Sequence, residues 1–186
     1  MRKQRYDPAR HHRRSIRLKG YDYTLGGAYF ITVCTQNRAC LFGHVRCGEM
    51  HRNDAGDMIQ STWDELAAHY PGVEIDEFIV MANHIHGIVV LTGAPADGVA
   101  DTGRPVGTAV TLGLPDVVHR LKTLTTSRYC RGVTSEGWQP FDGRLWQRNY
   151  YDHIIRTERS LENIRQYIAD NPLNWDKDSE NPDRPR

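Results

Sequence analysis

Cysteine is scarce in this chain of 186 residues, which has only four of them. None takes part in a C-x-x-C pair or in zinc-ribbon spacing, so the sequence offers neither a thiol redox motif nor a cysteine-based zinc site. The chain is long enough to bury a core without disulfides or a structural metal. We therefore expect a globular protein in a reducing compartment. The cysteines are Cys34, Cys40, Cys47 and Cys130.

Long hydrophobic runs are also missing. The longest apolar stretch is short and is interrupted by two histidines, so it cannot span a membrane. The basic N-terminus is not followed by the apolar segment of a secretory signal. These absences predict a cytoplasmic protein with no membrane partner.

Several catalytic templates are absent. The sequence has no P-loop, no G-x-G-x-x-G after an expected strand, no H-E-x-x-H and no G-x-S-x-G. These absences exclude the nucleotide-binding loops of P-loop and dinucleotide-binding proteins. They also exclude the metal-binding helix of zinc proteases and the nucleophile turn of α/β-hydrolases.

An excess of charge of one sign is lacking overall, because 24 basic residues stand against 23 acidic ones. The distribution is nevertheless uneven. Residues 1–20 hold eight of the basic side chains and a single acid, Asp7, so the remainder is mildly acidic. A basic arm on such a body favours a polyanionic partner and a nucleoid-associated protein.

Hydrophobic periodicity and turn residues predict an α+β fold. The expected strands cover residues 28–35, 73–82, 84–91 and 145–155, and the expected helices cover 53–69, 115–131 and 157–171. Asn53 or Asp54 and then Thr157 are the expected helix caps. The order β-α-β-β-α-β with an additional C-terminal helix is ferredoxin-like, which implies an antiparallel sheet.

The domain organisation follows from the same reading. We expect a basic arm over residues 1–20, one domain over 21–175 and a frayed, charged tail over 176–186. Residues 92–113 are rich in small residues and are expected to form a mobile loop.

His84-Ile85-His86 is the first group of residues that could carry chemistry. On a strand, residues two apart point to the same face, so both imidazoles could converge on one ion. The alternating residues beyond them are apolar on both faces, which predicts a central strand. In the alternative reading, the two histidines are merely satisfied by hydrogen bonds near a strand end.

Tyr167 and Asn171 form the second group. They are four residues apart on the expected last helix and lie on one flank of its apolar stripe. The tyrosine ring could pack over the sheet while its hydroxyl remains exposed to solvent, and the asparagine could offer its side-chain carbonyl oxygen to the same ion. In the simpler alternative, Tyr167 is a tyrosine at the edge of the core with no catalytic role, and Asn171 is the ordinary end of a helix before a proline.

Basic residues interleaved with aromatic ones form the third group, because cations hold phosphates and aromatic faces stack bases. A solvated helix face is the alternative for each of these residues alone. The expected DNA-binding side chains are Arg5, Arg13, Arg14, Arg17, Lys19, Lys122, Arg128, Arg148 and Arg156.

Three segments resemble a known family. Residues 80–89 (VMANHIHGIV) resemble the HUH signature, histidine-hydrophobic-histidine, of single-tyrosine transposases. Residues 145–156 (LWQRNYYDHIIR) resemble the following strand of one branch, the REP-associated tyrosine transposases, relatives of the smallest insertion-sequence transposases. Residues 164–172 (IRQYIADNP) resemble that branch's nucleophile helix. The likeness extends over roughly residues 20–175.

The resemblance implies a transposase and endonuclease acting on single-stranded DNA at hairpin-forming repeats. Tyr167 would be the nucleophile, forming a 5′-phosphotyrosine intermediate. His84 and His86 would bind a divalent cation, and Asn171 would complete the protein ligands. The family implies Mg²⁺ or Mn²⁺; imidazole ligands alone suggest zinc or another transition metal, and their softness favours Mn²⁺ of the two.

Other functions stay open at this point. A protein of the same fold could bind DNA hairpins without cutting them. A small hydrolase could use His84 and His86 with a metal-bound water, and Tyr167 would then be dispensable. A basic RNA-binding protein with structural histidines is a third reading. The sequence leaves open a monomer or a homodimer, and an active site within one subunit or across two.

Overall fold

A four-stranded antiparallel sheet is the centre of the computed structural model, which describes residues 20–92 and 112–184. The strands lie in the order β4-β5-β1-β6, and all three pairings are antiparallel. This order and the connecting helices are those of the ferredoxin-like fold, so the predicted fold class is confirmed. The strands are β1 (Gly27–Cys34), β4 (Val73–Val80), β5 (His84–Leu91) and β6 (Tyr151–Ile155).

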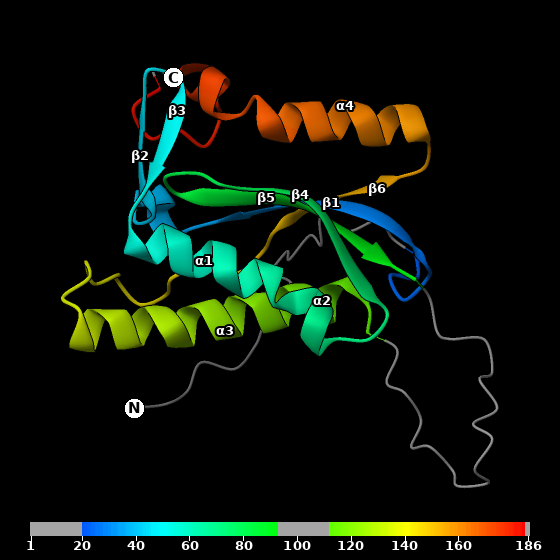
Figure 1. Cartoon of the computed structure of the whole chain (residues 1–186), viewed down its shortest axis with the longest axis horizontal. Helices are drawn as coiled ribbons and strands as arrows, with labels where there is room; N and C mark the ends of the chain where they lie inside the picture. Colours follow the sequence, from blue (N-terminus) through cyan, green and yellow to red (C-terminus); the bar gives the residue numbers. More distant parts are fainter. Residues whose placement is uncertain (1–19, 93–111, 185–186) are drawn as a thin grey trace, which may run out of the picture.

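Helices cover both faces of the sheet (Figure 1). On one side lie α1 (Asp54–Asp64), α2 (Leu66–His69) and α3 (Leu114–Ser135), and on the other lies α4 (Glu158–Ala169). Two predicted caps are confirmed: the Asn53 side chain accepts from the backbone of Gly56, and Thr157 accepts from Ser160. The expected helix over 53–69 is divided at Glu65 into α1 and α2.

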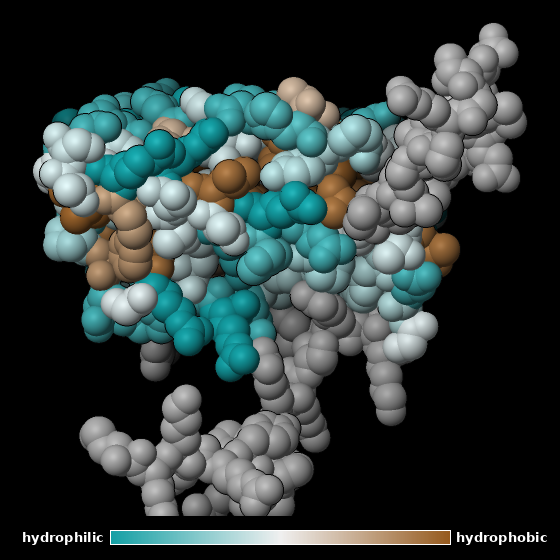
Figure 2. All heavy atoms as spheres, turned by 90° about the horizontal axis from the view of Figure 1, so that it is seen from below, coloured by the Kyte–Doolittle hydropathy of each residue, from teal (hydrophilic) through white to brown (hydrophobic). Residues whose placement is uncertain are grey.

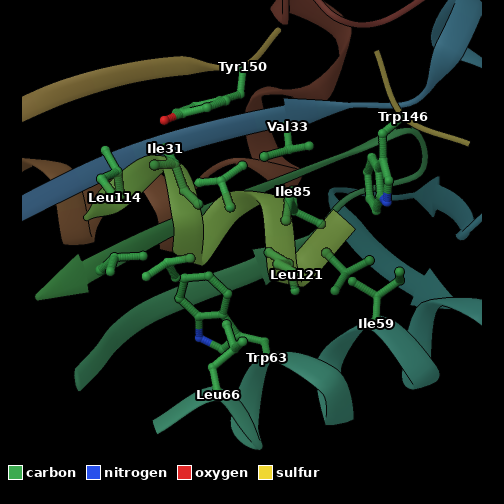
Figure 3. Close-up of a cluster of buried hydrophobic side chains, with 14 of the residues drawn as sticks. Ile31, Val33, Ile59, Trp63, Leu66, Ile85, Leu114, Leu121, Trp146 and Tyr150 are labelled. Carbon is green, nitrogen blue, oxygen red and sulfur yellow. The ribbon is translucent and has the colours of Figure 1, made fainter. Parts of the chain in front are cut away.

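β5 is central, as its apolar alternation predicts. Ile85, Val89 and Leu91 join the larger core, on the side of α1 and α3, whereas Ile88 and Val90 join the smaller core on the side of α4. Figure 3 shows the larger core, in which side chains from β1, β5, α1 and α3 point toward one another. His84 and His86 share the α4 face with Ile88, because alternate residues of a strand point to one side.

Gly87 allows an unusually close approach beneath β5. The rings of Trp63 and Phe78 are stacked with centroids 4.3 Å apart. A Cβ atom at Gly87 would lie 2.7 Å from the Trp63 ring and 2.9 Å from the Phe78 ring. Any larger residue at this position would therefore displace the stacked pair.

The predicted strand over residues 145–155 is shorter in the structure, since β6 begins at Tyr151. Trp146 makes one isolated bridge to Thr35. The ammonium of Lys122 donates to the backbone carbonyls of residues 147, 148 and 149, at 2.8, 3.4 and 3.1 Å. These carbonyls therefore face α3 rather than a neighbouring strand.

A small hairpin beside the main sheet has no counterpart among the predicted elements. It consists of β2 (Gly43–Arg46) and β3 (Glu49–Arg52). Both strands are short and largely exposed, which explains why hydrophobic alternation does not reveal them. The single turn η1 (Gln36–Arg38) precedes this hairpin.

Residues 176–184 are packed, whereas the sequence predicts a frayed tail over 176–186. After η2 (Pro172–Lys177), the Glu180 carboxylate accepts from the Cys34 thiol at 3.3 Å and from the Arg38 guanidinium at 3.0 Å. Its backbone carbonyl accepts from Asn83 Nδ2 at 2.8 Å. Specific hydrogen bonds of this kind offset the entropy cost of ordering a charged segment.

Residues 1–19 of the expected arm and residues 93–111 of the expected loop lie outside the described residues, and the division into arm and domain stays a prediction. Across residues 20–92 and 112–184, no helix combines the length and apolarity needed to cross a membrane.

Candidate active site

Two buried imidazoles meet at the start of β5. The Nε2 atoms of His84 and His86 are 3.1 Å apart, and the two residues are 0% and 2% exposed. Two nitrogen ligands about 2.1 Å from one ion, at an angle between tetrahedral and octahedral values, are separated by roughly 3.0–3.4 Å. The spacing of the histidines therefore fits a shared cation.

Asn83 fixes the proton position on His84. The Asn83 amide nitrogen donates to the carbonyls of Arg38 and Glu180, at 3.0 and 2.8 Å, so its amide oxygen faces His84. That oxygen lies 2.9 Å from His84 Nδ1, which must carry the hydrogen because an amide oxygen only accepts. The Nε2 lone pair of His84 is consequently left for a ligand. Thr32 Oγ1 lies 2.8 Å from His86 Nδ1 and can hold that ring in the same way.

Tyr167 lies over the histidines from α4. Its ring is 5.3 Å from the His86 ring and 5.9 Å from the Phe30 ring, between centroids, and the residue is 49% exposed. The bidentate ion pair of Arg165 with Asp76 of the edge strand β4, at 2.6 and 2.9 Å, fixes α4 on the sheet. The tyrosine is thus held at the mouth of the histidine site and remains accessible to a large substrate.

Two oxygen acceptors beside the histidines lack a donor. Asn171 Oδ1 and Asp178 Oδ2 are buried and have no hydrogen-bond partner among the described residues. Asp178 Oδ2 lies 3.7 Å from His84 Nε2, and ligand atoms of His84, His86 and Asp178 all fall within 4.8 Å of one another. A buried acceptor without a partner costs about 1–3 kcal/mol, and a divalent cation would satisfy both oxygens. The residues therefore fit the predicted metal.

Burial determines the protonation states in the site. Desolvation lowers the pKa of His84 and lowers that of His86 well below its usual value, so both rings are neutral at pH 7 and able to ligate. Partial burial raises the pKa of Tyr167, and the negative charge of Asp178 raises it further. The phenol of Tyr167 is therefore protonated at neutral pH.

The structure brings together Tyr167, His84, His86 and Asn171, but it scatters the expected DNA-binding residues. Arg128 on α3 is bound by Glu65 and Thr62 on the opposite side of the sheet. The other described members are Lys122, which binds backbone carbonyls, and Arg148 and Arg156, which are exposed. Those in the arm, Arg5, Arg13, Arg14, Arg17 and Lys19, lie outside the described residues.

Sequence reasoning missed Asp178 and Asn83. Asp178 lies in a charged segment with no periodicity, and nothing in its neighbours distinguishes it from a solvated acid. Asn83 sits next to the histidines but reads as an ordinary turn residue between two strands. Only the packing of the C-terminal segment against Asn83 brings Asp178 to His84.

Similar proteins are known in Haemophilus influenzae. No family model matches the chain. An uncharacterised protein of Haemophilus influenzae strain Rd is 41% identical over 184 residues, covering 94% of this chain and 96% of that protein. A second protein of the same organism, named "Putative REP-associated tyrosine transposase", is 26% identical over 152 residues, covering 82% of this chain and 73% of that protein.

A solved structure of a REP-associated tyrosine transposase bound to a REP hairpin has the same fold. Its TM-score is 0.54 at 18% identity, over 85% of this chain and 73% of that chain. The predicted resemblance is confirmed, because the chain is similar in sequence to a protein named as a REP-associated tyrosine transposase and has the fold of a solved one. Within this relationship it belongs to the family of the uncharacterised H. influenzae protein.

Proposed function

We propose that the protein is a transposase that cleaves and rejoins single-stranded DNA at hairpin-forming repeats. One observation carries the proposal: an accessible tyrosine lies over two neutral, buried histidines whose Nε2 atoms are 3.1 Å apart, beside two buried oxygens without donors. The related solved structure contains a REP hairpin, which supports hairpin DNA as the substrate class.

In the proposed reaction the Tyr167 hydroxyl attacks a backbone phosphorus. A P–O bond forms to the tyrosine, the bond from phosphorus to the 3′ oxygen breaks, and the leaving oxygen takes up a proton as the phenol loses one. The products are a 5′-phosphotyrosine and a free 3′-hydroxyl. The covalent bond preserves the phosphodiester for rejoining, so the exchange is divided into two steps without ATP.

His84 and His86 would hold the divalent cation with Asp178 and Asn171, and Asn83 and Thr32 would orient the two rings. When bound, Mg²⁺ or Mn²⁺ supplies Lewis-acid polarisation of the phosphate oxygens. Two imidazoles in the ligand set favour Mn²⁺ over Mg²⁺. Asp178 is an addition to the ligands that the sequence implies.

The conformational role of α4 is to present the nucleophile. Arg165 anchors the helix to β4, and Ile168 buries its apolar face next to Phe30. Tyr167 therefore has little freedom beyond its own side-chain rotation, which favours attack from one direction.

The test is a covalent-adduct assay. The full-length protein is incubated with a labelled pool of single-stranded hairpin oligonucleotides and Mn²⁺, and the products are separated on a denaturing gel. We expect a shifted band that EDTA abolishes and that Tyr167→Phe lacks. Tyr151→Phe is the matched control, because Tyr151 is also exposed and also contacts Phe30, and it should retain the band.

The alternatives give different results in the same assay. Salt-sensitive hairpin binding without a band in the wild type would identify a binder that does not cut. Cleavage without a band, retained in Tyr167→Phe, would identify a hydrolase that uses metal-bound water. A band in Tyr167→Phe would remove the proposed role of this tyrosine.

A further inference from the structure

A cavity lies on the α3 side of the molecule, across the sheet from Tyr167. It has a volume of about 760 Å³ and runs between residues 119–130 of α3 and the connection 141–148; we call it the α3 groove. Figure 2 views the molecule from this side, where hydrophilic residues surround smaller apolar patches. Its size is within the range of roughly 300–1,000 Å³ that is usual for ligand sites.

The lining of the α3 groove has charge of one sign. Its charged side chains are Lys122, Arg144 and Arg148, and it includes no carboxylate. This is notable in a chain with 24 basic and 23 acidic residues. Arg144 and Arg148 are exposed. Lys122 holds the part of the wall that carries Arg148, through its bonds to the carbonyls of residues 147–149. Such a lining suits a phosphate-bearing ligand.

An aromatic wall stands next to these cations. Trp146 is buried, and its Nε1 donates to Thr125 Oγ1 at 2.8 Å, so the indole cannot turn. Phe141 packs its ring 5.6 Å from that of Tyr129. Trp146 therefore keeps this wall rigid, and the partly exposed ring of Phe141 provides the surface beside the cations on which a base of a single strand could stack.

The α3 groove leads to the reactive site around the edge of the sheet. Arg148 lines the groove, and Tyr151 follows three residues later at the start of β6, a span of at most about 11 Å. The Tyr151 ring is 6.2 Å from the Phe30 ring, against which Tyr167 also packs. β6 is the outer strand of the sheet, so a polynucleotide can pass its edge.

We propose that the α3 groove binds the single-stranded DNA that continues beyond the nucleotides at Tyr167. The groove is then an exosite, which adds affinity and directs the strand but holds none of the reacting atoms. This inference rests on the proposed function for the identity of its substrate. It also gives a role to Arg148, which is exposed and lines the groove.

The first test measures the salt dependence of binding in a Tyr167→Phe background, where no covalent adduct can form. The ligand is a hairpin oligonucleotide with a long single-stranded flank. Arg144→Glu with Arg148→Glu should weaken binding about tenfold or more and reduce the slope of log K against log salt by about 1.4, or roughly 0.7 for each lost contact. Arg131→Glu with Arg159→Glu is the control, because it makes the same charge change at exposed arginines outside the groove.

The second test uses the thiol of Cys130, which lines the groove and is exposed. Iodoacetamide labelling is followed by peptide mass spectrometry, with and without the oligonucleotide. The flanked hairpin should slow alkylation of Cys130 several-fold, a hairpin without the flank should not, and the Arg144→Glu/Arg148→Glu variant should lose the protection. The Arg131→Glu/Arg159→Glu variant should keep it.

An unchanged salt slope together with unprotected Cys130 would overturn the inference, as would protection by RNA but not by DNA. Failure of the proposed function has a different signature. If the wild type shows protection of Cys130 but no adduct, the exosite is supported and the cleavage chemistry is excluded. If it shows an adduct but no protection of Cys130, the cleavage chemistry is supported and the exosite is excluded.

Discussion

The amide of Asn83 determines which nitrogen of His84 carries hydrogen. Two backbone carbonyls fix the amide nitrogen, the amide oxygen accepts from His84 Nδ1, and Nε2 faces His86 with its lone pair. The ligand state of His84 is thus set by a turn residue that is itself fully buried.

Asn83→Ala should weaken Mn²⁺ binding by about 10–100-fold, because the His84 ring loses its orienting acceptor. Isothermal titration calorimetry measures the affinity, and circular dichroism checks the fold. Asn163→Ala is the control, since Asn163 is exposed on α4. Equal Mn²⁺ affinities for Asn83→Ala and the wild type would exclude this role.

Asp178→Asn should lower the pKa of the Tyr167 phenol in the metal-free protein. The negative charge of Asp178 opposes loss of the phenol proton, so removing that charge makes the phenolate easier to form. A ¹³C NMR titration of labelled tyrosine gives the shift, with Tyr167→Phe assigning the resonance. The same variant should bind Mn²⁺ more weakly. A Tyr167 pKa that stays constant or rises would contradict the electrostatic reading.

The ion pair of Asp76 with Arg165 should make stability depend on acidic pH. The hydrogen bonds from Arg165 lower the pKa of Asp76 below its usual value. A carboxylate with a depressed folded-state pKa adds stability above its unfolded pKa of about 3.9, and this contribution is lost as the pH falls through the folded-state pKa. Urea unfolding should show a smaller difference between Arg165→Gln and the wild type at pH 2.5 than at pH 7. The idea fails if the difference is the same at both pH values.

Gly87→Ala should reduce the free energy of unfolding by about 1–3 kcal/mol, because its Cβ overlaps the stacked rings of Trp63 and Phe78. Urea denaturation gives the value. Trp63→Phe removes the ring atoms nearest the new Cβ, so the double variant should lose less stability than the two single variants together. Strict additivity would show that the overlap is relieved elsewhere.

The strands of the main sheet and the long helices were predictable because their patterns are local. His84 and His86 alternate with core residues along one strand, and Asn53 and Thr157 cap helices within three residues of their partners. Periodicity likewise placed Tyr167 on the flank of α4. That Tyr167 on the last helix and the two histidines on the strand belong to one site was predicted from the family resemblance, because residue spacing alone does not relate the two elements.

The role of Asp178 in the site could not be predicted from the sequence, because its position depends on contacts between segments that are distant in the chain. Its approach to His84 follows from Glu180 binding Cys34 and Asn83, and no local pattern encodes these contacts. The early part of the predicted strand over 145–155 failed for a similar reason. Lys122 on α3 donates to the backbone carbonyl of residue 147, and this tertiary contact overrides the β-propensity of Trp146.

The hydrogen bond from Cys34 to Glu180 joins residues 146 positions apart in the chain. Closing a loop of that length costs entropy before any contact repays it, so the segment holding Asp178 should dock late in folding, after the sheet has formed. The carboxylate of Asp178 would then join the histidines only in the last stage of folding, and partly folded chains would bind the cation weakly. A cation that binds the native state alone would in turn favour the docked segment by mass action. Competence for chemistry is thereby tied to completion of folding.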